Sequence, residues 1–178
     1  AVGSNLRARV RVVSTPHHVL RSESSCTGTS ACSFGEPWTD NSDAPGSHNG
    51  VDTRSDMLRN LSSPLDPYTG QPLPQQRRHP HIDHCFPLPD ARDWRAAQWP
   101  QRKRTSFAND IERNLVVVSG DVNIDKGDST PSEWLPPWKG SQCWYAARYL
   151  TVAIYYQLAI TDADWHALSG ARRLWHRS

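Results

Sequence analysis

Residues 79–88 read "HPHIDHCFPL" and place three histidines and an aspartate on a stretch that otherwise has the pattern of a β-strand. Alternation along a strand would put His81 and Asp83 on one face and Ile82 and His84 on the other. Ionisable groups on a partly buried strand lose hydration free energy unless they are paired or have a chemical role. The stretch therefore predicts a polar site built on a strand.

The segments that follow predict a partner strand and a helix. "NLVVVS" (114–119) is rich in β-branched residues and predicts a second strand that pairs with the first as a hairpin. Two helices, over "DARDWRAAQW" (90–99) and "PQRKRTSFAND" (100–110), would separate the two strands in the sequence. "GDVNIDKGD" (120–128) predicts a short helix that ends at Gly127.

Four further segments carry recognisable patterns. The Arg/Val alternation of residues 7–14 predicts an edge strand with one solvated face. Residues 52–61 predict a helix capped by Asp52 or Thr53, and "TPSEW" (130–134) has the pattern of a capping box. The remaining predicted helices are the longest one, over 142–157, and a final one that opens at Thr161. The aromatic stripe at 144–156 favours core over a base-stacking platform.

Composition indicates one loop-rich domain. The chain has 178 residues, with 14 prolines, 10 glycines and a formal net charge of +2. This length is enough to bury a core. We expect residues 1–50 to form an irregular N-terminal arm packed on a main domain over 51–178. The net charge is too small to indicate a polyanionic partner by itself, although basic residues flank the histidine stretch: Arg77, Arg78, Arg102, Lys103 and Arg104.

The four cysteines and the lack of long apolar runs bear on the compartment. Cys26 and Cys32 enclose a short turn-rich loop that suits a local disulfide, whereas Cys85 and Cys143 could pair only through the fold. The sequence contains no C-x-x-C motif, so it does not indicate a structural zinc site. No apolar run reaches the roughly 18 residues of a membrane span, and no phosphate-loop motif predicts a nucleotide cofactor. We expect a secreted, oxidised protein with no membrane partner.

Polar residues on these elements have the chemistry of a one-metal phosphodiesterase site. Asp83 and His84 lie on the first strand, Asn114 opens the second, and Asn123 and Lys126 lie on the short helix. An imidazole is suited to deprotonate water near pH 7. A carboxylate and an amide carbonyl are ligands that a hard divalent cation prefers, and such a cation stabilises the negative charge that builds up on phosphate.

Several spaced motifs resemble the HNH endonuclease family whose domain also ends the GmrSD restriction enzymes, and which includes small exported nucleases. The motifs are "IDHCFPL", "FANDIERNLVVVSGDVNIDKGD", "PSEWLPP" and "CWYAARYLTVAIYYQLAIT", with "FGEPW", "NGVDTRSDML" and "DPYTG" upstream. The resemblance covers roughly residues 34–168. Cys85 stands where the family usually has a branched apolar residue, and Val51 where many relatives have a cysteine, so the resemblance does not fix the disulfide pairing.

The resemblance implies an α+β fold with a ββα-metal (HNH) hairpin-and-helix core, wrapped by additional helices. It implies His84 as the general base, with Asn114 bonded to backbone so that the histidine strand is fixed. Asp83 and Asn123 would be the ligands of one Mg²⁺ or Mn²⁺ per site. The implied reaction is endonucleolytic hydrolysis of DNA with little sequence preference, with RNA as the alternative substrate.

Three further residues are candidate substrate contacts. Lys126 and Arg104 would hold phosphate without reading sequence. His81 would touch phosphate or a third metal position, or else lie at the surface as an ordinary histidine.

Two other readings of the chain remain open. His84 could be a hydrogen-bonded core histidine in a nucleic-acid-binding module whose site has decayed. The domain could also act as a toxin or restriction effector beside a separate NTPase, inhibitor or immunity partner. A plasmid-nicking assay with magnesium and EDTA would identify the first, and toxicity on cytosolic expression the second.

Overall fold

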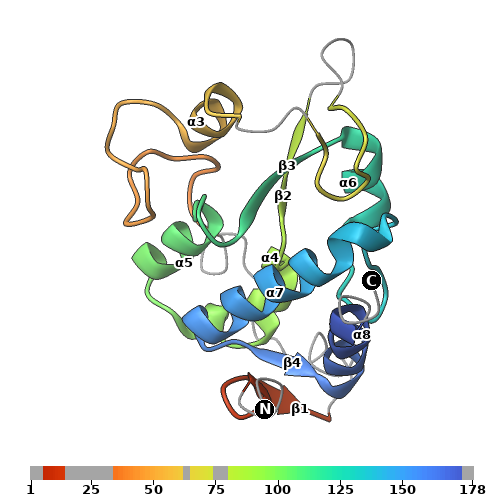
Figure 1. Cartoon of the computed structure of the whole chain (residues 1–178). Coiled ribbons are helices and arrows are strands. Elements are labelled where there is room, and N and C mark those ends of the chain that lie inside the picture. The colour runs from red at the N-terminus through yellow and green to blue at the C-terminus, as the bar shows by residue number, and fades with distance from the viewer. Residues whose placement is uncertain (1–5, 15–33, 62–64, 74–79, 174–178) are drawn as a thin grey trace.

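The computed structural model shows an α+β protein in which helices surround two small sheets (Figure 1). Strand β2 (His81–His84) pairs antiparallel with β3 (Leu115–Val118), and helix α6 (Gly120–Lys126) follows directly. The predicted α+β class and the predicted hairpin are confirmed. The structure describes residues 6–14, 34–61, 65–73 and 80–173.

The register of the hairpin places the His84 end of β2 beside the start of β3, where the helices interrupt the hairpin. His81 pairs with Val118 and His84 with Leu115, so the strand ends at His84 next to the start of β3. Ile82 and Asp83 are buried, while His81 and His84 are half-buried. The predicted alternation is therefore modified, because the carboxylate of Asp83 is buried together with the apolar face.

The connection between β2 and β3 contains α4 (Leu88–Asp93), the 3₁₀-helix η1 (Ala96–Gln98) and α5 (Gln101–Ala108). The first predicted helix is thus two short ones, separated at Arg95, which adopts a left-handed backbone with φ of 117°. Pro100 was predicted to start the second helix and instead caps it from outside, with Gln101 as the first helical residue.

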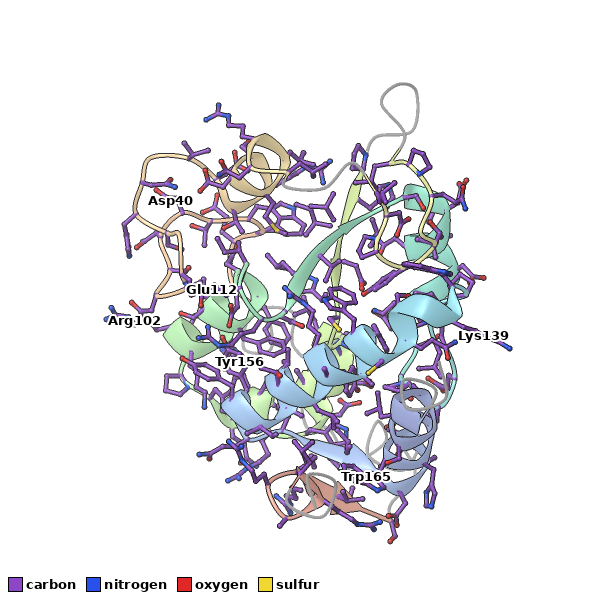
Figure 2. All side chains as sticks on the ribbon, viewed as in Figure 1. Asp40, Arg102, Glu112, Lys139, Tyr156 and Trp165 are labelled. Atoms are coloured by element: carbon purple, nitrogen blue, oxygen red, sulfur yellow. The ribbon has the colours of Figure 1, made fainter. Side chains whose placement is uncertain are left out.

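Helix α7 (Lys139–Tyr156) crosses the middle of the molecule and supplies the core (Figure 1). Tyr145, Tyr149 and Tyr156 are buried, and the ring of Tyr149 stacks on Phe86 with 4.6 Å between centroids. The core reading of the aromatic stripe is confirmed for these residues, whereas Trp144 is 39% exposed. Figure 2 shows Tyr156 among interior side chains, with Arg102 and Lys139 at the periphery.

A second, parallel sheet joins β1 (Arg11–Val13) to β4 (Ala159–Thr161), which precedes α8 (Asp162–Arg173). The alternating strand near the N-terminus is confirmed, but shorter than predicted. Its partner β4 was missed because a three-residue strand gives too little alternation to recognise. Thr161 ends β4 and caps α8, since its hydroxyl donates to Asp164 Oδ2 at 2.6 Å and accepts from Asp164 N.

Two predicted caps are resolved by the structure. Helix α3 (Thr53–Arg59) is capped by Asp52, whose carboxylate accepts from Ser55 N at 2.9 Å. In "TPSEW" the backbone N of Thr130 donates to Glu133 Oε2 at 2.9 Å, as in a capping box, but residues 131–133 form a turn and no helix follows.

The described cysteines are free thiols. Cys85 is buried and Cys143 half-buried, and they are not joined, so the pairing through the fold that the sequence left open does not form. Burial raises the pKa of Cys85 to about 12, which keeps this thiol protonated. Cys26 and Cys32 lie outside the described residues. Within the described ranges, no helix is long and apolar enough to cross a membrane.

Candidate active site

A cavity of about 410 Å³ lies where the end of β2, the start of α4 and the end of α6 meet. It brings together three of the predicted site residues, Asp83, His84 and Asn123. Asp128, just after α6, also lines it, and the rest of the lining is Ile82, Pro87, Leu88, Pro89 and Gly127. Helix α6 packs on β2, which is why residues distant in sequence share this cavity.

The imidazole of His84 is held at one nitrogen. Its Nε2 lies 2.9 Å from the carbonyl oxygen of Ala108, at the end of α5. A carbonyl can only accept, so Nε2 carries the proton and Nδ1 of the neutral ring keeps its lone pair. Burial lowers the pKa of His84 below its ordinary value, although the Ala108 carbonyl and the charge of Asp83 act in the opposite direction. The ring is therefore neutral at pH 7, the form that a base requires.

Asn114 ties down the chain that follows His84. Its Oδ1 accepts from Phe86 N at 2.8 Å, its Nδ2 donates to Phe86 O at 3.3 Å, and its own carbonyl accepts from Cys85 N. The side chain is fully buried. The predicted amide-to-backbone bonds are present, and their effect on catalysis stays a prediction.

Asp83 is buried and bonded through both carboxylate oxygens. Oδ1 accepts from Lys126 Nζ at 2.9 Å and Oδ2 from the hydroxyl of Tyr68 at 2.6 Å. Burial raises the pKa of Tyr68, so the phenol stays a neutral donor. Lys126 was predicted near phosphate, but it is only 1% exposed and its ammonium also donates to His84 O at 3.0 Å. Lys126 therefore binds two residues of β2 in the interior instead of facing solvent.

Two residues of the turn "DPYTG" support the site and were not identified from the sequence. Tyr68 bonds Asp83, and Asp66 joins the turn to the start of α6 by accepting from Ser119 N at 2.9 Å and from Tyr68 N at 2.8 Å. Both are fully buried. The proline and glycine of this segment indicate a turn, and no pattern in the sequence shows that the turn packs against the histidine strand.

His81 contacts Asn123. The amide Nδ2 of Asn123 lies 3.3 Å from His81 Nδ1, so the amide donates to a ring nitrogen that accepts. This bond orients the amide and leaves Asn123 Oδ1 without a hydrogen bond among the described residues. The imidazole of His81 fits above the start of α6 because residue 120 is glycine: an added Cβ would lie 3.0 Å from His81 Nε2.

Replacing Gly120 with alanine is expected to displace the His81 ring and lower the nicking rate about tenfold, the usual cost of losing a residue that orients a ligand. Stability should change by about 1 kcal/mol or less, because helix propensity favours alanine and crowding opposes it. Gly170→Ala in α8 is the matched control, since nothing lies within 4 Å of its added Cβ. An unchanged rate in the first variant would show that the His81–Asn123 contact is dispensable.

Arg104 does not line the cavity, and its contact with phosphate stays a prediction. Its side chain is buried and donates to Trp99 O and to Gln101 Oε1 near the start of α5. Of the other basic residues near the histidine stretch, Arg102 pairs with Asp43 and Lys103 lies over the Trp99 ring. The remaining two, Arg77 and Arg78, lie outside the described residues.

The oxygen donors at the cavity fit a hard divalent cation. Across the described ranges, no group of three or more histidine, cysteine, aspartate or glutamate side chains could hold a metal ion. The cavity instead offers the two predicted ligands, the carboxylate of Asp83 and the amide oxygen of Asn123, and the carboxylate of Asp128 also lines it. Each carboxylate oxygen has more than one acceptor position, so the bonds from Lys126 and Tyr68 leave room for a cation. Two protein ligands of this kind suit Mg²⁺, which commonly keeps several waters.

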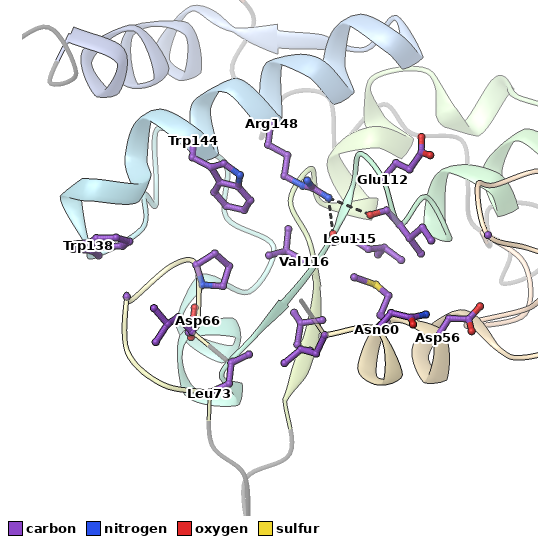
Figure 3. Close-up of a pocket in the computed structure, with 18 of the residues that line it drawn as sticks. Asp56, Asn60, Asp66, Leu73, Glu112, Leu115, Val116, Trp138, Trp144 and Arg148 are labelled. Carbon is purple, nitrogen blue, oxygen red and sulfur yellow. Dashed lines mark hydrogen bonds between the residues drawn. The ribbon is translucent and has the colours of Figure 1, made fainter. Parts of the chain in front are cut away.

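A larger cavity, of about 750 Å³, lies between α7, α3 and β3 (Figure 3). Trp138, Trp144 and Arg148 line it, and the guanidinium of Arg148 donates to Leu115 O at 2.8 Å and to Ile111 O at 3.4 Å. Neither His84 nor Asn123 lines this cavity. The smaller cavity is the candidate active site because it holds the base and both oxygen donors.

Comparison with known proteins gives two matches. The family model of "GmrSD restriction endonucleases, C-terminal domain" matches residues 37–170. A curated relative from Arthroderma benhamiae, described as an "Uncharacterized secreted protein", is 39% identical over 89 residues, which is 49% of this chain and 44% of the relative. The chain therefore spans less than half the length of that relative. No solved structure matches.

Proposed function

Because the chain belongs to the family of GmrSD restriction endonuclease C-terminal domains, a nuclease family whose substrate is nucleic acid, we propose that it is an HNH-type, metal-dependent endonuclease. It would hydrolyse phosphodiester bonds in DNA with little sequence preference. The observation that carries this proposal is the single cavity lined by Asp83, His84 and Asn123.

His84 supplies the base in this proposal. Its Nδ1 lone pair would take a proton from the attacking water, while Nε2 keeps its own proton and donates it in a hydrogen bond to the Ala108 carbonyl. That carbonyl stabilises the imidazolium formed in the step, because a charged donor makes a stronger hydrogen bond. Asn114 would act earlier, by holding the backbone after His84 so that the ring is already placed.

Asp83 and Asn123 would hold one Mg²⁺ or Mn²⁺. A bound divalent cation supplies stabilisation of the negative charge on the phosphate and the leaving oxygen. Lys126 and Tyr68 keep the carboxylate of Asp83 in place. His81 accepts from Asn123 Nδ2 and so fixes the orientation of the Asn123 amide. The protein's part is therefore to orient two oxygen donors and one base before substrate arrives.

A supercoiled-plasmid nicking assay tests the proposal. We expect nicking with Mg²⁺ or Mn²⁺ that excess EDTA abolishes and added metal restores. Asn123→Ala should require about 10- to 100-fold more metal for the same rate, by loss of a ligand group. Asn60→Ala, at an exposed asparagine that ends α3, is the matched control. Nicking that persists in EDTA would reject the metal, and no nicking under any condition would favour the decayed binding module.

The comparisons support two further parts of the proposal. The relative's description as a secreted protein supports export of this chain. The family's description names restriction endonucleases, which supports a second candidate function, a restriction effector. We propose that such an effector would act with a separate partner chain and be restrained by an inhibitor or immunity protein. Toxicity of the wild type, but not of His84→Ala, on cytosolic expression would support the effector.

A further inference from the structure

The indole of Trp38 lies against the imidazole of His84. The ring centroids are 5.9 Å apart and the planes are inclined by 16°, so the two rings are stacked. Such a separation is within the range of favourable aromatic contacts. Trp38 comes from the irregular segment 34–50, far from β2 in the sequence, and it is half-buried. It was not among the residues that the sequence predicted for the site.

The backbone of Trp38 is strained. Its φ is 58°, in the left-handed region that bulky residues rarely adopt. Its carbonyl accepts from Thr53 N at 3.0 Å, which anchors it to the start of α3. Strained backbone persists only where the surrounding structure fixes it, and it concentrates at functional sites. The segment thus holds this indole in one position at a conformational cost.

Helix α5 supplies one partner of the His84 imidazole, the Ala108 carbonyl, and contacts the segment that carries the other, Trp38. On one side, the last residue of α5, Ala108, supplies the carbonyl that binds His84 Nε2. On the other, α5 holds the segment that carries Trp38: Asp43 pairs with Arg102, and Asp43 N donates to Ser106 Oγ at 3.0 Å. The position of the indole relative to the base is therefore set by α5 together with the bond from Thr53 N of α3 to the Trp38 carbonyl.

We propose that Trp38 is a positioning residue that sets the plane of the His84 imidazole in the proposed hydrolysis. One hydrogen bond, at Nε2, fixes an edge of the ring but leaves its tilt free. A flat surface against one face removes that freedom, so the Nδ1 lone pair keeps a single direction. This inference rests on the proposed function, because it concerns the base of that reaction.

The test compares Trp38→Ala and Trp38→Phe in the nicking assay. The alanine variant should lose about tenfold or more in kcat, since small misplacements of a catalytic group are costly, while KM stays within about twofold. The phenylalanine variant keeps a flat ring and should recover most of the rate. Trp138→Ala, at a 51% exposed tryptophan away from this cavity, is the matched control.

A spectroscopic readout separates positioning from general support. In the wild type, the His84 ring protons, identified by their absence in His84→Ala, should be shifted upfield by the indole and should move downfield in Trp38→Ala. Unshifted protons in the wild type would overturn the proposal, even if the alanine variant does not fold. A rise in KM with kcat unchanged would also overturn it, by indicating a substrate contact. If His84→Ala itself retains full rate, the proposed function fails instead.

Discussion

His84→Ala is expected to reduce plasmid nicking about 10²-fold or more, the contribution of a positioned general base. The variant removes the Nδ1 lone pair that is left when Nε2 binds the Ala108 carbonyl. It keeps the oxygen donors of Asp83 and Asn123, so binding of metal and substrate should persist. The measurement is the initial rate at saturating Mg²⁺, with circular dichroism to verify the fold.

The control for this variant is His166→Ala, an exposed histidine on α8. Its rate should match the wild type. Added imidazole should restore part of the activity of His84→Ala, because it can enter the space left in the cavity and accept a proton. A rate within about threefold of the wild type would contradict the assignment of the base, given the 10²-fold or larger effect that a general base provides.

Lys126→Met should destabilise the protein by about 3–5 kcal/mol, the usual cost of breaking a buried ion pair from one side. Lys126 and Asp83 are 1% and 5% exposed, and their charged atoms are 2.9 Å apart. Methionine keeps much of the side-chain volume of lysine. The loss of unfolding free energy therefore reflects the unpaired charge of Asp83 more than the creation of a cavity. Urea unfolding followed by circular dichroism gives the free energy of unfolding.

Two companion variants make the result specific. Lys139→Met removes an exposed lysine at the start of α7 and should change stability by no more than about 0.5 kcal/mol. In Lys126→Met/Asp83→Asn, the second change removes the unpaired charge, and its amide oxygen can still accept from Tyr68, so part of the loss should be recovered. If the single variant loses less than about 1 kcal/mol, Asp83 does not depend on Lys126 in the way that a buried pair requires.

The hairpin and its helix could be predicted because their signals are local. Alternation around His84, the β-branched run after Asn114 and the glycine after Lys126 each report a single element. Given those elements, the shared cavity of Asp83, His84 and Asn123 follows from the order of the motifs. The sequence therefore predicted which residues share the candidate site, but not the distances and contacts between them.

Contacts between distant segments could not be predicted from local patterns. No periodicity shows that Tyr68 reaches Asp83 or that Trp38 stacks on His84. The direction of the Lys126 side chain could not be predicted either, because a lysine at the end of a short helix can face solvent or the core. The direction of Arg104 was also not predictable: a basic run predicted a phosphate contact, and the structure shows a buried guanidinium that donates to Trp99 O.

The long connection between β2 and β3 has a consequence for how the protein acquires its site. The two strands pair only after the chain from Cys85 to Asn114, with α4 and α5, has closed into a loop. Closing such a loop costs chain entropy before the strand contacts form, and non-local pairing of this kind slows folding. The cavity lined by Asp83, His84 and Asn123 forms only once β2, the start of α4 and the end of α6 have come together, so the proposed nuclease activity should emerge late in the folding reaction.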